Sequence, residues 1–150
     1  MVIFAKGKVL NIPATLPGIP EADAPNLDMP SIGMPFSSKY ISLCALLGAA
    51  SLGDIGYHFP DTSDTYKGID SKILLKEVVR LITEKGYTIG NVDATISLQL
   101  PKIKPHILAM RKKLAEVMDI DIDLVSVKAT TTEKLGYVGS EDGVNAHAVC

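Results

Sequence analysis

Three consecutive threonines followed by a glutamate, Thr130-Thr131-Thr132-Glu133, form the most distinctive polar cluster of the chain. Hydroxyl groups at the end of a strand can donate hydrogen bonds to phosphoryl oxygens, which predicts a phosphate-binding segment. The same spacing fits a capping box, in which Thr130 and Glu133 satisfy the first amides of a helix. Composition alone leaves both interpretations open.

A second cluster joins two carboxylates to a turn. Asp54 and Asp61 lie in the segment Asp54-Ile-Gly-Tyr-His-Phe-Pro-Asp-Thr62, where Pro60 restricts the backbone. The carboxylates are suited to accept hydrogen bonds from sugar hydroxyls or to bind a divalent ion. The alternative is a rigid loop whose aspartates cap nearby amides.

A third cluster places Lys102 and Lys104 just before Pro105, which suits the first turn of a helix. Free amides at a helix start already favour anions, so the two lysines predict an anion-binding turn. A solvated basic turn is the alternative.

Familiar cofactor motifs are missing. The glycines form neither a dinucleotide-binding pattern nor a Walker loop. A calcium loop at Asp61 is excluded because Tyr66 stands where that loop needs glycine and Lys72 where it needs glutamate. The three histidines lie roughly forty residues apart without ligands at metal-binding spacing, so no metal ligand is assigned.

Composition narrows the class of protein. The 150 residues carry 15 basic and 17 acidic side chains, a net charge of −2, so no basic surface for nucleic acid is expected. No apolar run is long enough to span a membrane, and Lys6 and Lys8 interrupt the first ten residues. Two cysteines make no disulfide framework, which favours a cytoplasmic protein.

Proline divides the chain into two parts. Six of the nine prolines precede residue 36, so residues 1–39 are expected to be atypical or disordered and residues 40–150 to form the domain. Periodicity predicts helices over 40–53, 71–85 and 105–118, a loop over 56–68, and strands over 92–98, 125–130 and 144–150. We expect Ser71 to cap the second helix, and the alternation of Val125, Val127 and Ala129 with polar residues predicts the second strand. The order predicts an α+β fold, a two-layer domain with a sheet on helices.

Five segments together resemble one family. LLGAASLGDIGYHFPDT, KGIDSKILLKE, GYTIGNVDATI, PKIKPHI and VKATTTEKLG occur in the order typical of 2-C-methyl-D-erythritol 2,4-cyclodiphosphate synthases. The resemblance runs from about Ala45 to Val149. It implies a homotrimer with active sites between neighbouring subunits, and a cytidine nucleotide as substrate.

The reaction implied by the resemblance belongs to non-mevalonate isoprenoid biosynthesis. The 2-phosphate of 4-diphosphocytidyl-2-C-methyl-D-erythritol 2-phosphate attacks the β-phosphorus, and CMP leaves. No protein nucleophile is needed, so catalysis consists of positioning and charge neutralisation. The family uses zinc together with magnesium or manganese.

Site residues follow from the same resemblance. Thr131 takes the position that stabilises the transition state. The segments that would bind the ribose, the methylerythritol end, the cytidine and the phosphates supply the remaining positions: Asp54, Gly56, Phe59, Pro60, Asp61, Thr62, Ser63, Pro101, Lys102, Thr130, Thr132, Glu133 and Tyr137.

The chain departs from the family pattern where zinc would bind. Residues 1–40 contain no histidine, so the family's Asp-x-His and its second histidine are both missing. Cys44 and Ser140 replace an aspartate and a phosphate-contacting arginine of the family pattern. These departures imply an impaired synthase. The alternatives are a non-catalytic trimeric paralogue that binds cytidine nucleotides or phosphate, and a defective gene product whose residues before about 40 are read out of frame.

Overall fold

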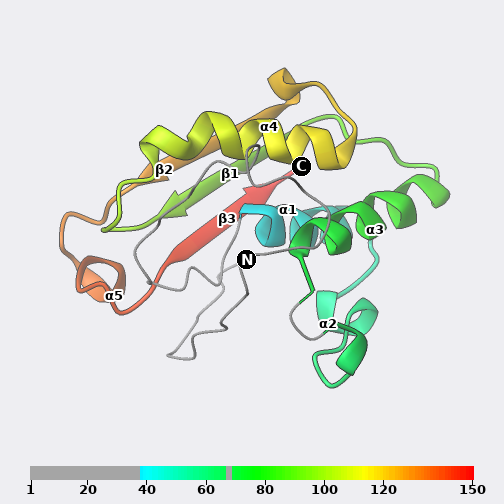
Figure 1. The fold of residues 1–150 in the computed structure, drawn as a ribbon, viewed down its shortest axis with the longest axis horizontal. Coiled ribbons are helices and arrows are strands. Elements are labelled where there is room, and N and C mark those ends of the chain that lie inside the picture. Colours follow the sequence, from blue (N-terminus) through cyan, green and yellow to red (C-terminus); the bar gives the residue numbers. More distant parts are fainter. Residues whose placement is uncertain (1–37, 67–68) are drawn as a thin grey trace, which may run out of the picture.

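The computed structural model describes residues 38–66 and 69–150, which form a mixed sheet with helices packed on it (Figure 1). The predicted segment 1–39 therefore lies almost entirely outside the described residues. The helices are α1 (Ser38–Ala49), α2 (Ile55–His58), α3 (Ser71–Glu84), α4 (Ile107–Met118) and α5 (Gly136–Gly139), and the strands are β1 (Val92–Ser97), β2 (Val125–Thr130) and β3 (Asn145–Val149).

The sheet has the order β2-β1-β3. β1 and β2 are parallel and are connected through α4, whereas β1 and β3 are antiparallel. The register pairs Ser97 with Thr130 on one side and with Asn145 on the other. The carboxyl ends of β1 and β2 therefore lie at the same edge, where β3 begins.

Alternation along β1 sends one set of side chains into the core. Val92, Ala94 and Ile96 are buried, as predicted, and so is Leu98 just beyond the strand. In β2 the pattern holds for Val125 and Val127 but not for Ala129, which is exposed. The predicted strand is confirmed, but its buried part ends before the strand does.

Two helices pack directly on the sheet, and a third packs on these two. α1 contacts β1 and β3, α4 contacts β2, and α3 packs across α1 and α4 (Figure 1). The apolar stripe predicted on α3 is largely confirmed, since Leu74, Leu75, Val78 and Ile82 are buried. The largest fully buried side chains come from all three helices and two strands: Leu43, Leu47, Leu75, Leu114, Met118, Val78, Val92 and Val125. This arrangement fits the predicted α+β fold.

Local signals set the ends of the helices. Asp70, not Ser71, caps α3, because its Oδ1 accepts a hydrogen bond of 2.9 Å from the amide of Lys72. After α3, Gly86 adopts a φ of +84°, which favours glycine. Pro105 lies in a short 3₁₀ turn ahead of α4 rather than in α4 itself. The ammonium of Lys85 donates to the carbonyl of Ala50 and so joins the end of α3 to the end of α1.

Among residues 38–66 and 69–150, no helix combines the length and apolar character needed to cross a membrane.

Candidate functional site

The first group of predicted site residues lies in the α2 loop, defined here as residues 54–66. The loop predicted over 56–68 is interrupted by α2 and by a 3₁₀ turn at Asp64–Tyr66. Asp54 caps α2, since its Oδ2 accepts from the amide of Gly56 at 2.9 Å. A Cβ atom at residue 56 would lie 2.9 Å from that same oxygen, so a larger residue here would push the Asp54 carboxylate away from its capping position. The capping interpretation of Asp54 is therefore confirmed.

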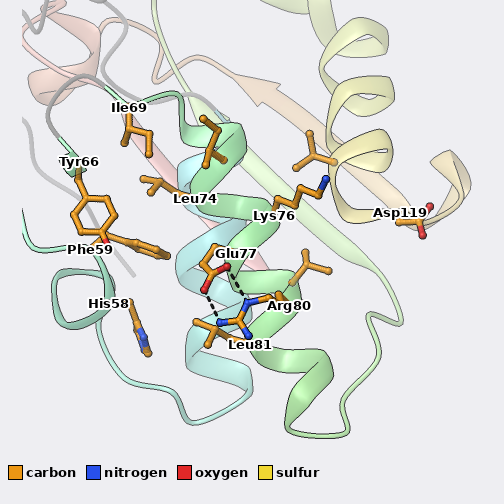
Figure 2. A pocket seen from close by; sticks show the side chains of 13 residues that line it. His58, Phe59, Tyr66, Ile69, Leu74, Lys76, Glu77, Arg80, Leu81 and Asp119 are labelled. Atoms are coloured by element: carbon orange, nitrogen blue, oxygen red, sulfur yellow. Dashed lines mark hydrogen bonds and ion pairs between the residues drawn. The ribbon is translucent and has the colours of Figure 1, made fainter.

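Aromatic packing within the α2 loop and one imidazole restrain its conformation. The rings of Phe59 and Tyr66 meet edge to face with centroids 5.6 Å apart. His58 Nε2 lies 2.8 Å from the carbonyl oxygen of Leu52, which ties the loop to the end of α1. Figure 2 shows His58, Phe59 and Tyr66 beside a groove of about 690 Å³ whose opposite wall is α3.

The remaining predicted residues of the α2 loop follow Phe59 in the turn before α3. Asp61 and Thr62 are exposed, whereas Pro60 and Ser63 are half-buried. The hydroxyl of Ser63 accepts a hydrogen bond from the amide of Thr65 at 3.3 Å. This turn therefore presents a carboxylate and a hydroxyl to solvent on a backbone that local bonds restrain.

The second group of predicted residues lies in the strand-end cluster, defined here as residues 98–104 and 130–137. Pairing between parallel strands continues past β1, since the amide of Leu98 donates to the carbonyl of Thr130 at 2.9 Å. Lys102 is exposed and Pro101 is half-buried after a cis peptide bond from Leu100. The sheet thus brings the lysine-containing turn and the threonine segment together.

Hydroxyl groups organise the threonine segment. Thr131 Oγ1 donates to Glu133 Oε1 at 2.6 Å, and Thr132 Oγ1 donates to the carbonyl of Leu135 at 2.7 Å. Glu133 and Lys134 adopt left-handed φ values of 51° and 66°. Because no helix starts at that point, the capping-box interpretation is wrong. The threonine hydroxyls lie instead in a tight turn after β2.

Two residues outside the predicted set hold this turn. The amide of Lys134 donates to Oε1 of Gln99 at 3.4 Å, which bridges the two segments of the cluster. A Cβ atom at Gly139 would lie 2.1 Å from the carbonyl carbon of Lys134, so α5 can pack here only with glycine. Neither role was predicted from the sequence, because both depend on contacts between residues that are distant in sequence or separated by a turn.

The α2 loop and the strand-end cluster lie at opposite ends of the molecule. In Figure 1 α2 is at the lower right, while α5 and the end of β2 are at the far left. One copy of the chain therefore does not bring α2 and the end of β2 together. The chain presents two separate polar surfaces.

Metal-ligating side chains are dispersed in the part of the chain that the structure describes. No group of three or more His, Cys, Asp or Glu residues there is arranged to hold a metal ion. Burial, together with a smaller effect of the negative charge of Asp54, raises the pKa of the Cys44 thiol to about 11. A protonated thiol is a poor metal ligand. The residues described thus do not fit a tetrahedral zinc site.

Sequence comparison identifies relatives of this chain. Residues 42–150 match the model of the YgbB family. The 2-C-methyl-D-erythritol 2,4-cyclodiphosphate synthase of Chlorobium phaeobacteroides (strain BS1) is 63% identical over 106 residues, which cover 71% of this chain and 67% of the relative. The synthase of Bacteroides fragilis (strain YCH46) is 64% identical over 104 residues, 69% of this chain and 65% of the relative. The chain thus spans about two thirds of the length of these relatives.

Solved structures with the same fold include members of the same family. The bifunctional IspDF of Campylobacter jejuni superposes with a TM-score of 0.72 and 38% identity, covering 75% of this chain and 30% of that chain. IspF of Plasmodium falciparum in complex with CDP gives a TM-score of 0.62 and 36% identity, covering 71% of this chain and 63% of that chain. This chain belongs to the YgbB family, whose relatives named above are 2-C-methyl-D-erythritol 2,4-cyclodiphosphate synthases.

Proposed function

We propose that this chain is a 2-C-methyl-D-erythritol 2,4-cyclodiphosphate synthase that keeps its nucleotide-binding surfaces and turns over slowly for lack of the family's zinc ligands. Its relatives carry this name, and one neighbour in structure is a CDP complex. The reaction is a phosphorus–oxygen lysis in which the substrate's own 2-phosphate attacks the β-phosphorus. The new oxygen–phosphorus bond replaces the bond to CMP, which leaves.

The strand-end cluster is the proposed binding surface for cytidine and phosphate. Pro101 and Lys102 would hold the base end. The hydroxyls of Thr130 and Thr132, which donate to the carbonyls of Thr131 and Leu135 in this structure, would rotate to donate to phosphoryl oxygens instead. Thr131 would stabilise the charge that develops on the transferred phosphoryl group. Support comes from the sheet register, which fixes the two segments of this cluster side by side. Glu133 orients the Thr131 hydroxyl, and Tyr137 borders the same turn.

The α2 loop is the proposed surface for the other end of the substrate. Asp54 and the amide region of Gly56 would contact the ribose. Phe59 and the turn of Pro60, Asp61, Thr62 and Ser63 would hold the methylerythritol end. The exposed carboxylate at Asp61 and the aromatic wall at Phe59 suit a small polyol with a methyl group.

A complete site then requires a second copy of the chain. The separation of the two surfaces is the single observation that carries this proposal. A substrate that contacts both must lie between neighbouring subunits, so the homotrimer expected from the family gives three sites around one axis. A cytoplasmic location and the absence of nucleic-acid partners stay predictions from the sequence.

Metal use is the point at which the chain departs from its family. Zinc and either magnesium or manganese are the cofactors that the family implies. Residues 1–40 contain no histidine, and the described residues supply no cluster of three ligands. We therefore derive no step through zinc and propose that turnover is impaired.

One further departure supports reduced turnover. The family arginine after the Leu-Gly-Phe-x-Gly segment is replaced by Ser140, whose Oγ lies 2.6 Å from Asp142 Oδ2. The family arginine would supply a cation that attracts phosphate, whereas the Ser140 hydroxyl is hydrogen-bonded to a carboxylate. A non-catalytic paralogue that binds cytidine nucleotides is the second candidate, which the missing zinc ligands favour.

Binding and turnover separate these proposals. We expect the purified full-length chain to bind CDP in calorimetry and to release CMP from the cytidine substrate slowly, with zinc and magnesium present, relative to the Chlorobium phaeobacteroides synthase. Binding of CDP without any CMP release would favour the non-catalytic paralogue. Turnover equal to that of the relative, or stoichiometric zinc in the purified chain, would refute impairment. No CDP binding would refute the proposed function.

A further inference from the structure

Gln99 connects the two segments of the strand-end cluster across 35 positions in sequence. It lies two residues beyond the end of β1 and is half-buried. Its Oε1 accepts a hydrogen bond of 3.4 Å from the backbone amide of Lys134. The contact lies one residue beyond the last backbone bond between these segments, Leu98 to Thr130.

The turn that Gln99 contacts has an energetically unfavourable backbone conformation. Glu133 and Lys134 both have left-handed φ values, 51° and 66°. For residues with a Cβ atom this conformation costs about 1–2 kcal/mol each. Such a turn persists only where its surroundings determine it. On one side Gly139 leaves room for the Lys134 backbone, and on the other Gln99 supplies the acceptor.

The same turn carries the hydroxyls assigned to phosphate. Thr131 Oγ1 bonds to the side chain of Glu133, the first of the left-handed residues, and Thr132 Oγ1 bonds to the carbonyl of Leu135, just after them. A change in the backbone at residues 133–134 therefore moves both hydroxyls. Positioning of such donors to a fraction of an ångström matters in phosphoryl transfer.

We propose that Gln99 is a positioning residue, which holds the Glu133–Lys134 turn so that the threonine hydroxyls face the diphosphate. This inference rests on the proposed function, since it assigns phosphate to this turn. Gln99 acts through the backbone of Lys134 and need not touch substrate. Loss of its acceptor should weaken contacts to phosphate more than contacts to the cytidine base, which depend on Pro101 and Lys102.

The experiment compares two substitutions of similar size. Gln99→Met removes the acceptor, whereas Gln99→Glu keeps an oxygen at the same distance from the backbone. Lys112→Met, at an exposed position of α4, is a control for a surface methionine. Amide hydrogen exchange at Lys134 reports the contact itself, and calorimetry with CDP and with cytidine reports its consequence.

For Gln99→Met we expect exchange at Lys134 to be about fivefold faster and CDP affinity about fivefold lower, as for one lost hydrogen bond, with cytidine affinity unchanged. Gln99→Glu should keep the slow exchange at Lys134, and Lys112→Met should match the parent chain. Unchanged exchange at Lys134 in Gln99→Met would overturn the proposal, as would equal losses for CDP and cytidine. If the parent chain binds no CDP while Gln99→Met still speeds exchange, the proposed function fails but the contact of Gln99 stands.

Discussion

The α2 loop and the strand-end cluster are stabilised in different ways. The strand-end cluster continues the ladder of β1 and β2, and its turn is restrained by Gln99 and Gly139. Among the described residues no strand pairs with the α2 loop, which depends on the Asp54 cap, on His58 and on aromatic packing. Regions with few buried backbone bonds open more readily. One surface is thus preorganised by the sheet, while the other is held by a few side chains.

The largest expected effect is at the strand-end cluster. Gly139→Ala places a Cβ atom 2.1 Å from the Lys134 carbonyl carbon, a contact that must be relieved by moving backbone. We expect a loss of about 1–3 kcal/mol in the free energy of unfolding, as for other overpacked sites, and loss of CDP binding. Chemical denaturation and calorimetry measure the two effects.

The matched control is Gly48→Ala in α1, where an added Cβ meets no atom within 4 Å. Alanine in a helix should leave stability equal or higher. If Gly139→Ala proved as harmless as Gly48→Ala, then Gly139 would not restrain the strand-end cluster.

A smaller effect should appear in the α2 loop. Asp54→Ala removes the acceptor for the Gly56 amide, and the loss of such a cap costs about 1 kcal/mol. Exchange should rise for amides of residues 55–66 and stay unchanged in β1. Asp54→Asn keeps a capping oxygen and should retain most protection. A rise in exchange that spreads equally into β1 would show that the two regions are not separately stabilised.

Sequence patterns predicted the elements well and their arrangement in space poorly. Helix α3 was predicted correctly, because apolar residues at helical spacing mark the face of a helix that is buried. These residues are Leu74, Leu75, Val78 and Ile82. The cap was assigned to Ser71 instead of Asp70 because adjacent residues are both good caps and only geometry separates them. Helix α2 was missed because four residues carry no periodic signal.

The sequence predicted two sets of site residues, but it did not predict how these sets are arranged in space. The threonine segment and the α2 loop stood out by composition. Their spacing in the sequence does not show that they lie at opposite ends of the folded molecule. The contact of Gln99 with Lys134 depends on strand register, which the sequence does not display. Gly139 can be seen in the sequence Leu-Gly-Tyr-Val-Gly139, but only the packing of α5 explains why glycine is needed there.

The smallest expected effect concerns the face of the sheet away from the helices. Lys128 Nζ lies 2.5 Å from Asp93 Oδ2, and this hydrogen bond, with a smaller contribution from Ser126, holds the pKa of Asp93 below its usual value. A lowered pKa in the folded state stabilises the fold above the unfolded pKa of about 3.9, and that stabilisation is lost as pH falls through the folded pKa.

Lys128→Met should therefore raise the pKa of Asp93 and reduce stability at pH 7 by less than about 1 kcal/mol, because the pair is partly exposed. The difference from the parent chain should shrink on acidification below about pH 4. Titration of Asp93 by NMR and denaturation at several pH values measure both. An unchanged pKa would contradict the ion pair.

The most direct test of a site shared between copies uses two defective chains. Asp54→Ala damages the α2 loop and Lys102→Glu damages the strand-end cluster, so each alone should bind CDP poorly. In trimers assembled from equal amounts of both chains, a site needs one intact surface from each of two neighbours, and about a quarter of the sites should recover the parent affinity. If both surfaces of a site came from one chain, every chain would carry a defect, and co-assembly would restore no CDP binding at all.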